Sequence, residues 1–600
     1  MLTHTTADSF LGLFSRQAES RADEAAVRFG GETLTYRQVD QWSGRIAAQL
    51  ADCGVGPGSL VALAADRGPG PVIGVLAVLR AGAGYLALDP ATPARRQRQM
   101  IQETAPDCVL AEPGLDQFPT LDAPRVRLAR TDGGPVLPMD PRRARPTGED
   151  VFHVVYTSGT TGVPKGVRIS RRSVLNRLEW MWRDHPFAAG AVVAVQKSCS
   201  LVASPWELLG GLLQGVPSAV LTHEEVLDPA LLLDAVERET ITHLYLTPHL
   251  IRGLLDEADR RGGAGHQPVL VTSGADALPV ETVRRFRRRF PATTLLNLYG
   301  MTETSSNVAA FDTARLAEGA ERVPVGRPVA GAVISVRDRF QRVLPPGVTG
   351  EIWIAGTPLA TGYVREDTAD TDRFVRLDGV PHCRTGDRGR LLAEGDLDVV
   401  GRADTQVKIR GYRVELEEVE KNLAKAPGVT RAGAFVTEAD TARGAEAELL
   451  ACVTGGADLD TAAVRAFVRD RLPDYMVPSR LSVVPALPEA SNGKVDRRLL
   501  PGLAERSRDP GHSAFAARDA LESDVAAIWR ELLGAAPADR SSNFFDAGGH
   551  SLLAVRFTNR LDRVLGIRVS LRQLLAGPTF DALVAICREK AGPAGTVRGD

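Results

Sequence analysis

The sequence predicts a multidomain protein: a large α/β region, then a small α+β region, then an all-α four-helix bundle. Three observations predict this order. Short β-branched runs alternate with longer helical patterns up to about residue 390, Gly-Asp turns then separate short strands, and apolar residues recur at helical spacing over the last ~80 residues. A chain of 600 residues is also long enough for about three or four cores.

The first region, residues 1–400, carries the alternation that favours an α/β fold. The run VFHVVYTS (151–158) leads into a glycine loop, and PVLVTSG (268–274) precedes the helical pattern ETVRRFRRRF (281–290). Strands that are buried between helices are apolar runs of this kind. The basic residues within 284–290 are interpreted as one face of an amphipathic helix.

The second region, residues 404–500, is predicted to be a small α+β domain. A segment that begins at Thr385, TGDRGRLLAEGDLDVVGRADTQVKIRGYRVE, is typical of short strands joined by Gly-Asp turns. A helix over about 416–426 follows, then further strand-like runs and the polar turn SNGKVDR (491–497).

A linker and a helical bundle come next. Residues 501–518 are rich in glycine, serine, proline and charged side chains without a sustained period, which indicates a linker. Residues 519–595 contain patterns with apolar residues at helical spacing, and Asp519 is a candidate N-cap of the first. We therefore predict a four-helix bundle over this range.

Composition and charge favour an ordinary globular protein. With 72 basic and 74 acidic side chains the formal net charge is -2, so nothing favours binding to nucleic acid or to an anionic membrane. The six cysteines are dispersed and form no CxxC pair or Cys/His cluster, so neither zinc nor a disulfide framework is predicted. The N-terminus lacks a secretory pattern, and the apolar run 71–79 is too short to span a bilayer, so a cytoplasmic protein is expected.

The segment YTSGTTGVPKG (156–166) has the chemistry of a phosphate-binding loop. It offers backbone N–H groups made accessible by glycines, a lysine and four serine or threonine hydroxyls, on Thr157, Ser158, Thr160 and Thr161. Its spacing does not fit the Walker A pattern. Taken alone, the segment also fits a flexible surface loop.

Four further segments carry groups that suit a nucleotide. NLYGMTETS (297–305) brings together an aromatic ring, a hydroxyl and a carboxylate suited to a hard cation, and RTGDRGR (384–390) carries a short carboxylate that could accept hydrogen bonds from a ribose. GRADTQVKIRGYRVE (401–415) and SNGKVDR (491–497) supply Arg402 and Lys494 for negative charge.

In order and spacing, these segments resemble the core motifs of the ANL adenylating superfamily, specifically adenylation domains of nonribosomal peptide synthetases. The resemblance extends from LTYRQVD (34–40) through LRAGAGYLALDP (79–90), GEIWIAGTPLATGYV (350–364) and LPDYMVPSRL (472–481) to Lys494. It implies that 1–400 is the large adenylation subdomain and 404–500 the small, mobile one.

The resemblance also implies a reaction and a set of residues. In the family, the carboxylate of an acid attacks the α-phosphorus of MgATP, which gives an acyl adenylate and pyrophosphate. The implied catalytic residues are Lys494, which bridges the carboxylate and the α-phosphate, Thr302 at the α-phosphate, Glu303 as the Mg²⁺ ligand, and Gly411. The implied ATP-binding residues are Thr157, Ser158, Gly159, Thr160, Thr161, Gly162, Lys165, Gly274, Ala275, Asn297, Tyr299, which stacks on adenine, Gly300, Asp387, which holds the ribose, and Arg402.

Asp404, in GRADTQ, matches the family's hinge between the two subdomains. Taken alone it is also an ordinary turn aspartate. The resemblance implies that the small subdomain swings after adenylation, removing Lys494 and bringing the KIRGYR face to the site for thioester formation.

Ser551 lies in NFFDAGGHSLLAVRF (543–557), which resembles the phosphopantetheine attachment motif of a peptidyl carrier domain. A serine that begins a helix is also a common N-cap, and the two interpretations are compatible. The resemblance implies that 519–595 is a carrier domain and that a covalent 4'-phosphopantetheine on Ser551 supplies the thiol.

The substrate pocket departs from the common family pattern. Relatives that activate α-amino acids have a segment like FDASVWE, whose aspartate pairs with the substrate ammonium; here LVASPWE (201–207) has Val202 at that position and Ala203 next to it. An unpaired ammonium in a closed pocket would cost several kcal/mol. The other pocket positions implied by the resemblance are Trp206, Tyr245, Val271, Ser273, Leu298, Ser306 and Asn307.

Three substrate interpretations stay open at this point. The acid carries no α-amine (a hydroxy, oxo or aryl acid), or its amine lies elsewhere, as in a β-amino acid, or the alignment is shifted by one or two residues and the substrate is a standard α-amino acid. We expect an acid whose amine is absent or displaced.

Two other functions compete with an adenylation-thiolation enzyme: a ligase that releases acyl-CoA, and a carrier or scaffold with an inactive adenylation domain. The motif around Ser551 disfavours the first, and the retained Lys494, Glu303 and Asp387 disfavour the second. The chain has no HHxxxDG or GxSxG motif, so condensation or tailoring partners are expected in trans, unless the chain is part of a larger assembly line. A phosphopantetheinyl transferase is the implied modifying enzyme, and an MbtH-like protein is a further candidate partner.

Overall fold

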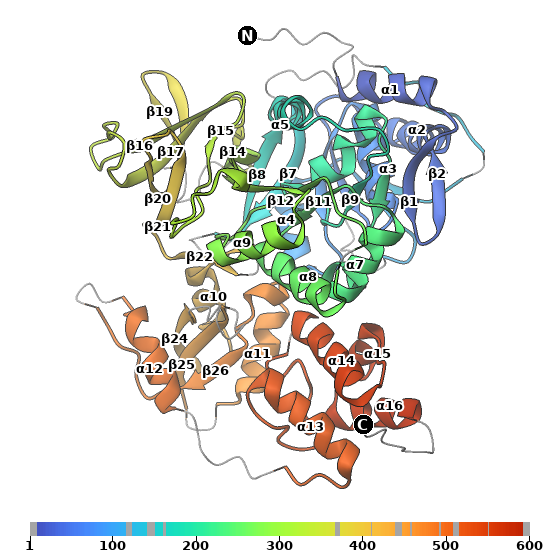
Figure 1. Ribbon diagram of the computed structural model, residues 1–600. Coiled ribbons are helices and arrows are strands. Elements are labelled where there is room, and N and C mark those ends of the chain that lie inside the picture. The colour runs from blue at the N-terminus through green and yellow to red at the C-terminus, as the bar shows by residue number, and fades with distance from the viewer. Residues whose placement is uncertain are drawn as a thin grey trace. The chain divides into compact units, whose positions relative to one another are not determined.

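The computed structural model describes residues 9–115, 123–131, 133–140, 150–159, 164–263, 265–365, 373–409, 411–437, 447–456, 459–490, 494–507, 515–549 and 551–591. It divides into two compact units, Met1–Glu415 and Leu416–Asp600. Figure 1 shows the elements of both units.

The first unit contains a seven-stranded sheet in the order β18-β8-β7-β4-β3-β5-β6. Its five strands from β7 to β6 run parallel, while β8 and β18 add antiparallel pairs at one edge. The strands are β3 (Leu60–Ala64), β4 (Gly84–Leu88), β5 (Cys108–Ala111), β6 (Arg125–Arg127), β7 (Val151–Thr157), β8 (Lys165–Ser170) and β18 (Gly362–Tyr363). All five residues of β4 are buried, which explains why its sequence does not alternate.

A second sheet has nine strands in the order β15-β14-β13-β12-β11-β9-β10-β1-β2. The strands are β1 (Ala25–Phe29), β2 (Glu32–Thr35), β9 (Val193–Val195), β10 (Ser218–Val220), β11 (His243–Leu246), β12 (Leu270–Ser273), β13 (Thr294–Met301), β14 (Ser306–Asp312) and β15 (Arg327–Pro328). Its parallel run from β1 to β13 places the carboxyl ends of β11, β12 and β13 at one edge, where ligands bind in many open α/β sheets.

Helices of the first unit pack with these sheets. They are α1 (Phe10–Ser20), α2 (Tyr36–Asp52), α3 (Gly70–Ala81), α4 (Ala94–Thr104), α5 (Arg171–Asp184), α6 (His223–Leu227), α7 (Pro229–Arg238), α8 (Pro248–Arg260) and α9 (Val280–Arg289). Helix α3 is buried on every side because nearly all its residues are apolar or small. In α9, Val283 and Phe286 are buried while Arg285 pairs with Asp256 and Asp259, which confirms the amphipathic interpretation of the basic run.

The rest of the first unit is antiparallel. Strands β16 (Ala332–Arg337), β17 (Gly350–Gly356), β19 (Phe374–Leu377), β20 (Val380–Leu391) and β21 (Leu397–Arg402) form a third sheet, seen in yellow tones in Figure 1. Strands β22 (Gln406–Ile409) and β23 (Tyr412–Glu415) form a hairpin. The structure places this hairpin in the first unit, although the sequence assigns it to the region that begins at 404.

The second unit begins with a small α+β part. Its sheet has the order β24-β25-β26, with strands β24 (Val429–Val436), β25 (Leu449–Gly455) and β26 (Arg480–Val483) and helices α10 (Leu416–Leu423), α11 (Thr461–Arg469) and α12 (Leu500–Arg506). Helix α12 takes up the start of the stretch predicted as a linker. The helix forms because Leu500 and Ala504 are buried against the apolar residues of this sheet, which periodicity over so few residues does not reveal.

Four helices follow, as the periodicity predicts: α13 (Ala520–Leu533), α14 (Ser551–Leu565), α15 (Leu571–Ala576) and α16 (Phe580–Ala591). Asp519 is confirmed as the N-cap of α13, since its side chain accepts a hydrogen bond from the backbone N–H of Glu522. The ring of Trp529 meets the rings of Phe544, Phe557 and Phe580 edge to face in the core.

The predicted fold class is confirmed: a large α/β part, a small α+β part and a four-helix bundle are all present. The predicted boundaries at 400, 404, 500 and 518 stay predictions. Over the described ranges, none of the helices combines the length and the apolar character needed to cross a membrane.

Candidate active site

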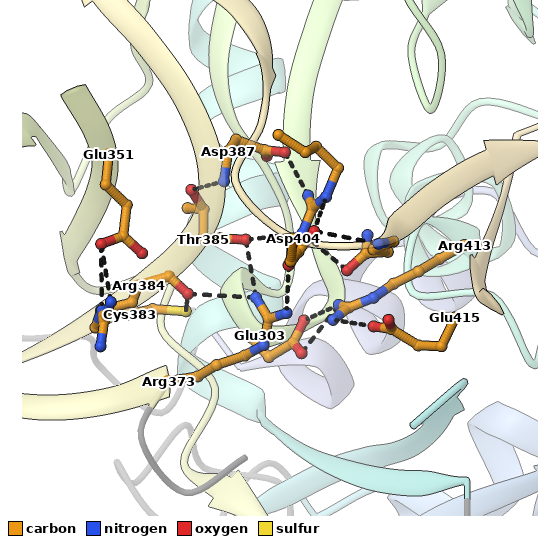
Figure 2. A network of polar contacts seen from close by, with 12 residues as sticks. Glu303, Glu351, Arg373, Cys383, Arg384, Thr385, Asp387, Asp404, Arg413 and Glu415 are labelled. Carbon is orange, nitrogen blue, oxygen red and sulfur yellow. Dashed lines mark hydrogen bonds and ion pairs between the residues drawn. The ribbon is translucent and has the colours of Figure 1, made fainter. Parts of the chain in front are cut away.

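The first feature of the candidate site is a buried ion pair at Glu303, in the short turn after β13. Its carboxylate accepts a hydrogen bond from the Tyr363 hydroxyl at 3.0 Å and two from Nη1 of Arg413 at 3.0 and 2.8 Å. Burial by itself would raise the pKa of Glu303, but the charges of Arg413 and Arg373 outweigh burial and hold this pKa below its ordinary value. Glu303 is therefore an ionised carboxylate that forms an ion pair with the guanidinium group of Arg413 (Figure 2).

Arg413 belongs to the β22–β23 hairpin, and the hairpin has two more contacts with predicted site residues. The Ser158 hydroxyl donates to the backbone oxygen of Arg413 at 3.0 Å. Gly411 has a φ of +83°, and a Cβ there would lie 3.1 Å from Cγ2 of Thr247 and 3.4 Å from Cβ of Ala275. The tip of the hairpin therefore lies against the ends of β7, β11 and β12.

A second cluster of polar side chains connects β20 with β21. Asp387 and Arg402 are direct partners in the strand register, and their side chains form an ion pair. The other carboxylate oxygen of Asp387 accepts a hydrogen bond from the Tyr299 hydroxyl at 2.6 Å. Arg402 also donates to both oxygens of Asp404, at 2.7 and 2.6 Å, and Arg373 lies 3.2 Å from Asp404. Figure 2 shows that the Asp387 and Glu303 groups lie near each other. Arg373 pairs with Asp404 and donates to the backbone oxygen of Thr385, and its charge also acts on Glu303.

These contacts influence the protonation of Asp404. Burial would raise its pKa, but the hydrogen bond and the charge of Arg402 outweigh burial, so the pKa lies below its ordinary value. The predicted hinge residue is thus a charged aspartate that pairs with two arginines on an exposed bend of the chain.

The predicted phosphate loop connects two paired strands. Thr157 ends β7, Lys165 begins β8, and the two residues are partners in the antiparallel register. The hydroxyl oxygen of Thr157 is buried and has no hydrogen-bond partner among the described residues. Burial, with a contribution from the charge of Arg413, lowers the pKa of Lys165 to about 8. Gly159 is described, whereas Thr160, Thr161 and Gly162 lie outside the described residues.

Several predicted residues lie within or directly after the neighbouring strands β11, β12 and β13: Tyr245, Val271, Ser273, Gly274, Ala275, Asn297, Leu298, Tyr299 and Gly300. Thr302 follows β13 in the turn that holds Glu303. Gly300 has no room for a side chain, because a Cβ would lie 1.6 Å from the backbone oxygen of Ser306. Ala275 and Ser306 have φ values of +72° and +94°, which cost free energy outside glycine. Such conformations cluster at functional sites.

A small cavity, partly open to solvent, lies beside this edge and is lined by residues of α5, of 202–206 and of the turn before β14. Four of its lining residues were predicted: Val202, Ala203, Trp206 and Ser306. Five were not: Val174, Arg177, Leu178, Pro205 and Ser305. Trp206 begins a π-helical turn, Trp206–Gly210, a rare conformation that often marks functional sites.

Arg177 is the functional candidate that sequence reasoning missed. It lies on α5, and Nε and Nη2 donate to Oδ1 of the predicted pocket residue Asn307 at 3.2 and 2.8 Å. The available indication was its spacing: Arg177 shares a helix face with the buried residues Val174 and Met181. A charged side chain on the apolar face of a helix is uncommon without a partner.

Two predicted residues lie in the second unit. Lys494 lies between β26 and α12, where its backbone oxygen accepts a hydrogen bond from the N–H of Ala490 at 2.8 Å. Ser551 is the first residue of α14. The preceding Gly549 is required by close packing, because a Cβ there would lie 2.3 Å from the ring of Phe544.

Comparison with known families matches three segments of the chain. Residues 14–364 match the family described as AMP-binding enzyme, 418–494 match the AMP-binding enzyme C-terminal domain, and 523–587 match the phosphopantetheine attachment site.

Among curated proteins, the chain is 32% identical over 590 residues to the dimodular nonribosomal peptide synthase of Bacillus subtilis (strain 168), covering 95% of this chain and 25% of that protein. It is 33% identical over 599 residues to tyrocidine synthase 3 of Brevibacillus parabrevis, covering 97% and 9%. The chain thus spans 25% or less of the length of these two relatives.

Among solved structures, the chain is similar to holo-PA1221, a nonribosomal peptide synthetase protein containing adenylation and PCP domains bound to a vinylsulfonamide inhibitor. The TM-score is 0.79 at 25% identity, and the match covers 97% of each chain.

Proposed function

Because this chain belongs to the AMP-binding enzyme family and carries a phosphopantetheine attachment domain, we propose that it activates a carboxylic acid as an acyl adenylate and loads it onto its own carrier domain. It is an adenylating enzyme with a carrier domain, of the kind found in nonribosomal peptide synthetases. The observation that carries the proposal is the grouping of Glu303, Asp387 and Ser158, at the start of the β7–β8 loop, in one unit that also contains a cavity.

Enzymes of this family use MgATP, and residues of the first unit fit it. Glu303 already holds the cation of Arg413, and carboxylate oxygens are the ligands that Mg²⁺ prefers. The Thr157 hydroxyl, which has no hydrogen-bond partner among the described residues, and the ammonium group of Lys165 suit phosphate oxygens. When bound, MgATP supplies an α-phosphorus whose surrounding negative charge is partly neutralised.

The proposed first half-reaction joins two anions, so cations along the line of attack are needed to cancel their repulsion. The acid's carboxylate oxygen forms a bond to the α-phosphorus, and the bond from this phosphorus to the pyrophosphate oxygen breaks. Lys494 is proposed to bridge the carboxylate and the α-phosphate, with Thr302 at the same phosphate and Asp387 at the ribose.

The second half-reaction is proposed to use the β22–β23 hairpin. The thiolate of the carrier's arm attacks the acyl carbon, and AMP leaves. Arg413 supports this assignment, because it donates hydrogen bonds to both oxygens of the Glu303 carboxylate. A Mg²⁺ ion would need the same oxygens during adenylation. We therefore assign the contact between Arg413 and Glu303 to the step after adenylation. Asp404 is proposed as the hinge of the motion between the two steps. This motion removes Lys494 from the reacting atoms and brings the hairpin to them.

Replacing Arg413 by methionine tests this assignment. We expect thioester formation to fall roughly 10-fold to 100-fold, because the hairpin loses its anchor at the site, while ATP–pyrophosphate exchange stays within about threefold of wild type. The two rates are measured separately, by exchange and by mass spectrometry of the holo protein.

Lys408→Met is the matched control, because exposed Lys408 is the register partner of Arg413 on the same hairpin. Equal losses of both activities in Arg413→Met, or a comparable loss in the control, would contradict the assignment.

We further propose that the acid lacks an α-amine or holds it atypically, as in a β-amino, hydroxy, oxo or aryl acid. The side chains of Val202 and Ala203 line the cavity and offer no carboxylate to an ammonium group. These two apolar side chains therefore support a substrate that has no α-ammonium group at this wall of the cavity.

The experiment that tests the proposed function is ATP–pyrophosphate exchange over a panel of α-amino, β-amino, hydroxy, oxo, aryl and dicarboxylic acids. We expect exchange with at least one acid that lacks an α-amine. Exchange with a standard α-amino acid alone would refute the substrate proposal, and no exchange with any acid would refute the activity.

Partners are proposed from the chemistry of the carrier. Its serine needs a phosphopantetheinyl transferase, and the loaded thioester needs condensation, tailoring or other biosynthetic enzymes that consume it. An MbtH-like protein is a further candidate partner.

A further inference from the structure

Arg177 places a buried positive charge at the wall of the substrate cavity. It is 7% exposed and lines the cavity together with Val202 and Trp206. Its guanidinium carbon lies 5.2 Å from the ring centre of Trp180 and 5.9 Å from that of Trp206. Two aromatic faces and one amide thus hold the group in a fixed orientation.

The charge of Arg177 has no counterion among the described residues. Its hydrogen bonds go to the neutral amide of Asn307, and Nη1 has no hydrogen-bond partner in that part of the chain. Burial lowers the pKa of Arg177 to about 10, with an electrostatic influence from Tyr245 in the other direction. The side chain is still charged at neutral pH, and a buried charge without a partner is costly.

Glu207 follows the cavity-lining Trp206, and its carboxylate is already paired. One oxygen accepts hydrogen bonds from the backbone N–H groups of Gln196 and Lys197 at 2.8 Å each, and the other pairs with the Lys197 ammonium at 2.5 Å. The ammonium in turn lies 3.2 Å from the ring centre of Tyr245. Glu207 and Lys197 neutralise each other, so the charge of Arg177 remains at the cavity.

We propose, on the premise of the proposed function, that Arg177 binds a second carboxylate of the substrate, so that the enzyme activates a small dicarboxylic acid without an ammonium group. One carboxylate goes to the α-phosphate, and the other accepts a hydrogen bond from Nη1, the guanidinium nitrogen that Asn307 leaves free. Guanidinium–carboxylate hydrogen bonds are among the strongest in proteins, whereas a substrate ammonium would meet an uncompensated positive charge. Val174, Leu178 and Trp206 form apolar walls for the carbon chain between the two groups.

The test compares dicarboxylic acids of three to six carbons with their monomethyl esters, monoamides and ω-amino analogues in ATP–pyrophosphate exchange. We expect kcat/KM for the best diacid to exceed that of its monoester by roughly 10²-fold, because the ester lacks the anion. In Arg177→Met this ratio should fall to about one, while Arg177→Lys should restore part of it.

The matched control is Arg172→Met, an exposed arginine on the same helix, which should keep the full ratio. A binding measurement without ATP adds a second readout: the diacid should raise the unfolding midpoint of wild type and not that of Arg177→Met, with similar midpoints for the two ligand-free proteins.

The outcomes separate the two proposals. Strong exchange with acids that lack a second anion, or a diacid preference that survives Arg177→Met, overturns the role of Arg177 while the proposed function stands. Preference for the ω-amino analogue or for the neutral monoamide likewise overturns it. Exchange with no acid at all overturns the proposed function itself.

Discussion

Replacing Lys494 by alanine is expected to lower ATP–pyrophosphate exchange roughly 10²-fold to 10³-fold, the usual effect of removing one preorganised group that stabilises charge in a transition state. The effect is large because the first half-reaction brings a carboxylate to a phosphate, and no neutral side chain can offset that repulsion. The measurement is exchange at saturating ATP with the best acid from the panel.

The same variant should form the thioester at nearly the wild-type rate when the acyl adenylate is supplied preformed. This split follows from the proposed hinge motion at Asp404, which removes Lys494 before the thiolate attacks. Lys425→Ala, an exposed lysine in the second unit, is the control for a general loss of charge. If Lys494→Ala lost both half-reactions equally, the assignment of the lysine to adenylation alone would be wrong.

Replacing Ser551 by alanine is expected to abolish protein-bound acyl groups completely. The side chain supplies the only oxygen through which the proposed phosphodiester to the arm can form, so the effect is a loss rather than a reduction. Mass spectrometry after incubation with coenzyme A and a phosphopantetheinyl transferase should show neither the arm nor the acyl group.

Exchange by Ser551→Ala should stay within about twofold of wild type, because adenylation does not require the arm. Ser541→Ala is the control, since Ser541 is exposed in the same helical part and its hydroxyl donates to Asp539 at 2.7 Å. Free acyl-CoA formation that is unchanged by Ser551→Ala would favour the ligase that releases acyl-CoA.

Much of the fold could be predicted because its strongest features are local. The β7 strand, the amphipathic helix α9 and the Asp519 cap of α13 each depend on residues within a few positions of one another. The helical start of the predicted linker was missed for the opposite reason. Helix α12 is short and forms by burying Leu500 and Ala504 against strands far from it in the sequence.

The residues of the candidate site also fall into those that local motifs indicate and those that only contacts between distant segments reveal. The resemblance to the adenylation and carrier families implied the catalytic, nucleotide-binding and attachment residues, and these roles stay predictions until the variants above are measured. Spacing could not reveal that Arg413 holds Glu303, because the two residues are 110 positions apart. It also could not reveal Arg177, which lies 130 positions from its partner Asn307 and has no motif around it.

The sequence by itself therefore determined the fold class, the order of its parts, the motifs for nucleotide and arm, and the missing carboxylate at Val202. Only the tertiary structure decided that Arg413 pairs with Glu303 and that the charged side chain of Arg177 lines the cavity. The physical reason is that periodicity and motifs record neighbours along the chain, whereas the partner of a buried charge is chosen by packing between distant segments.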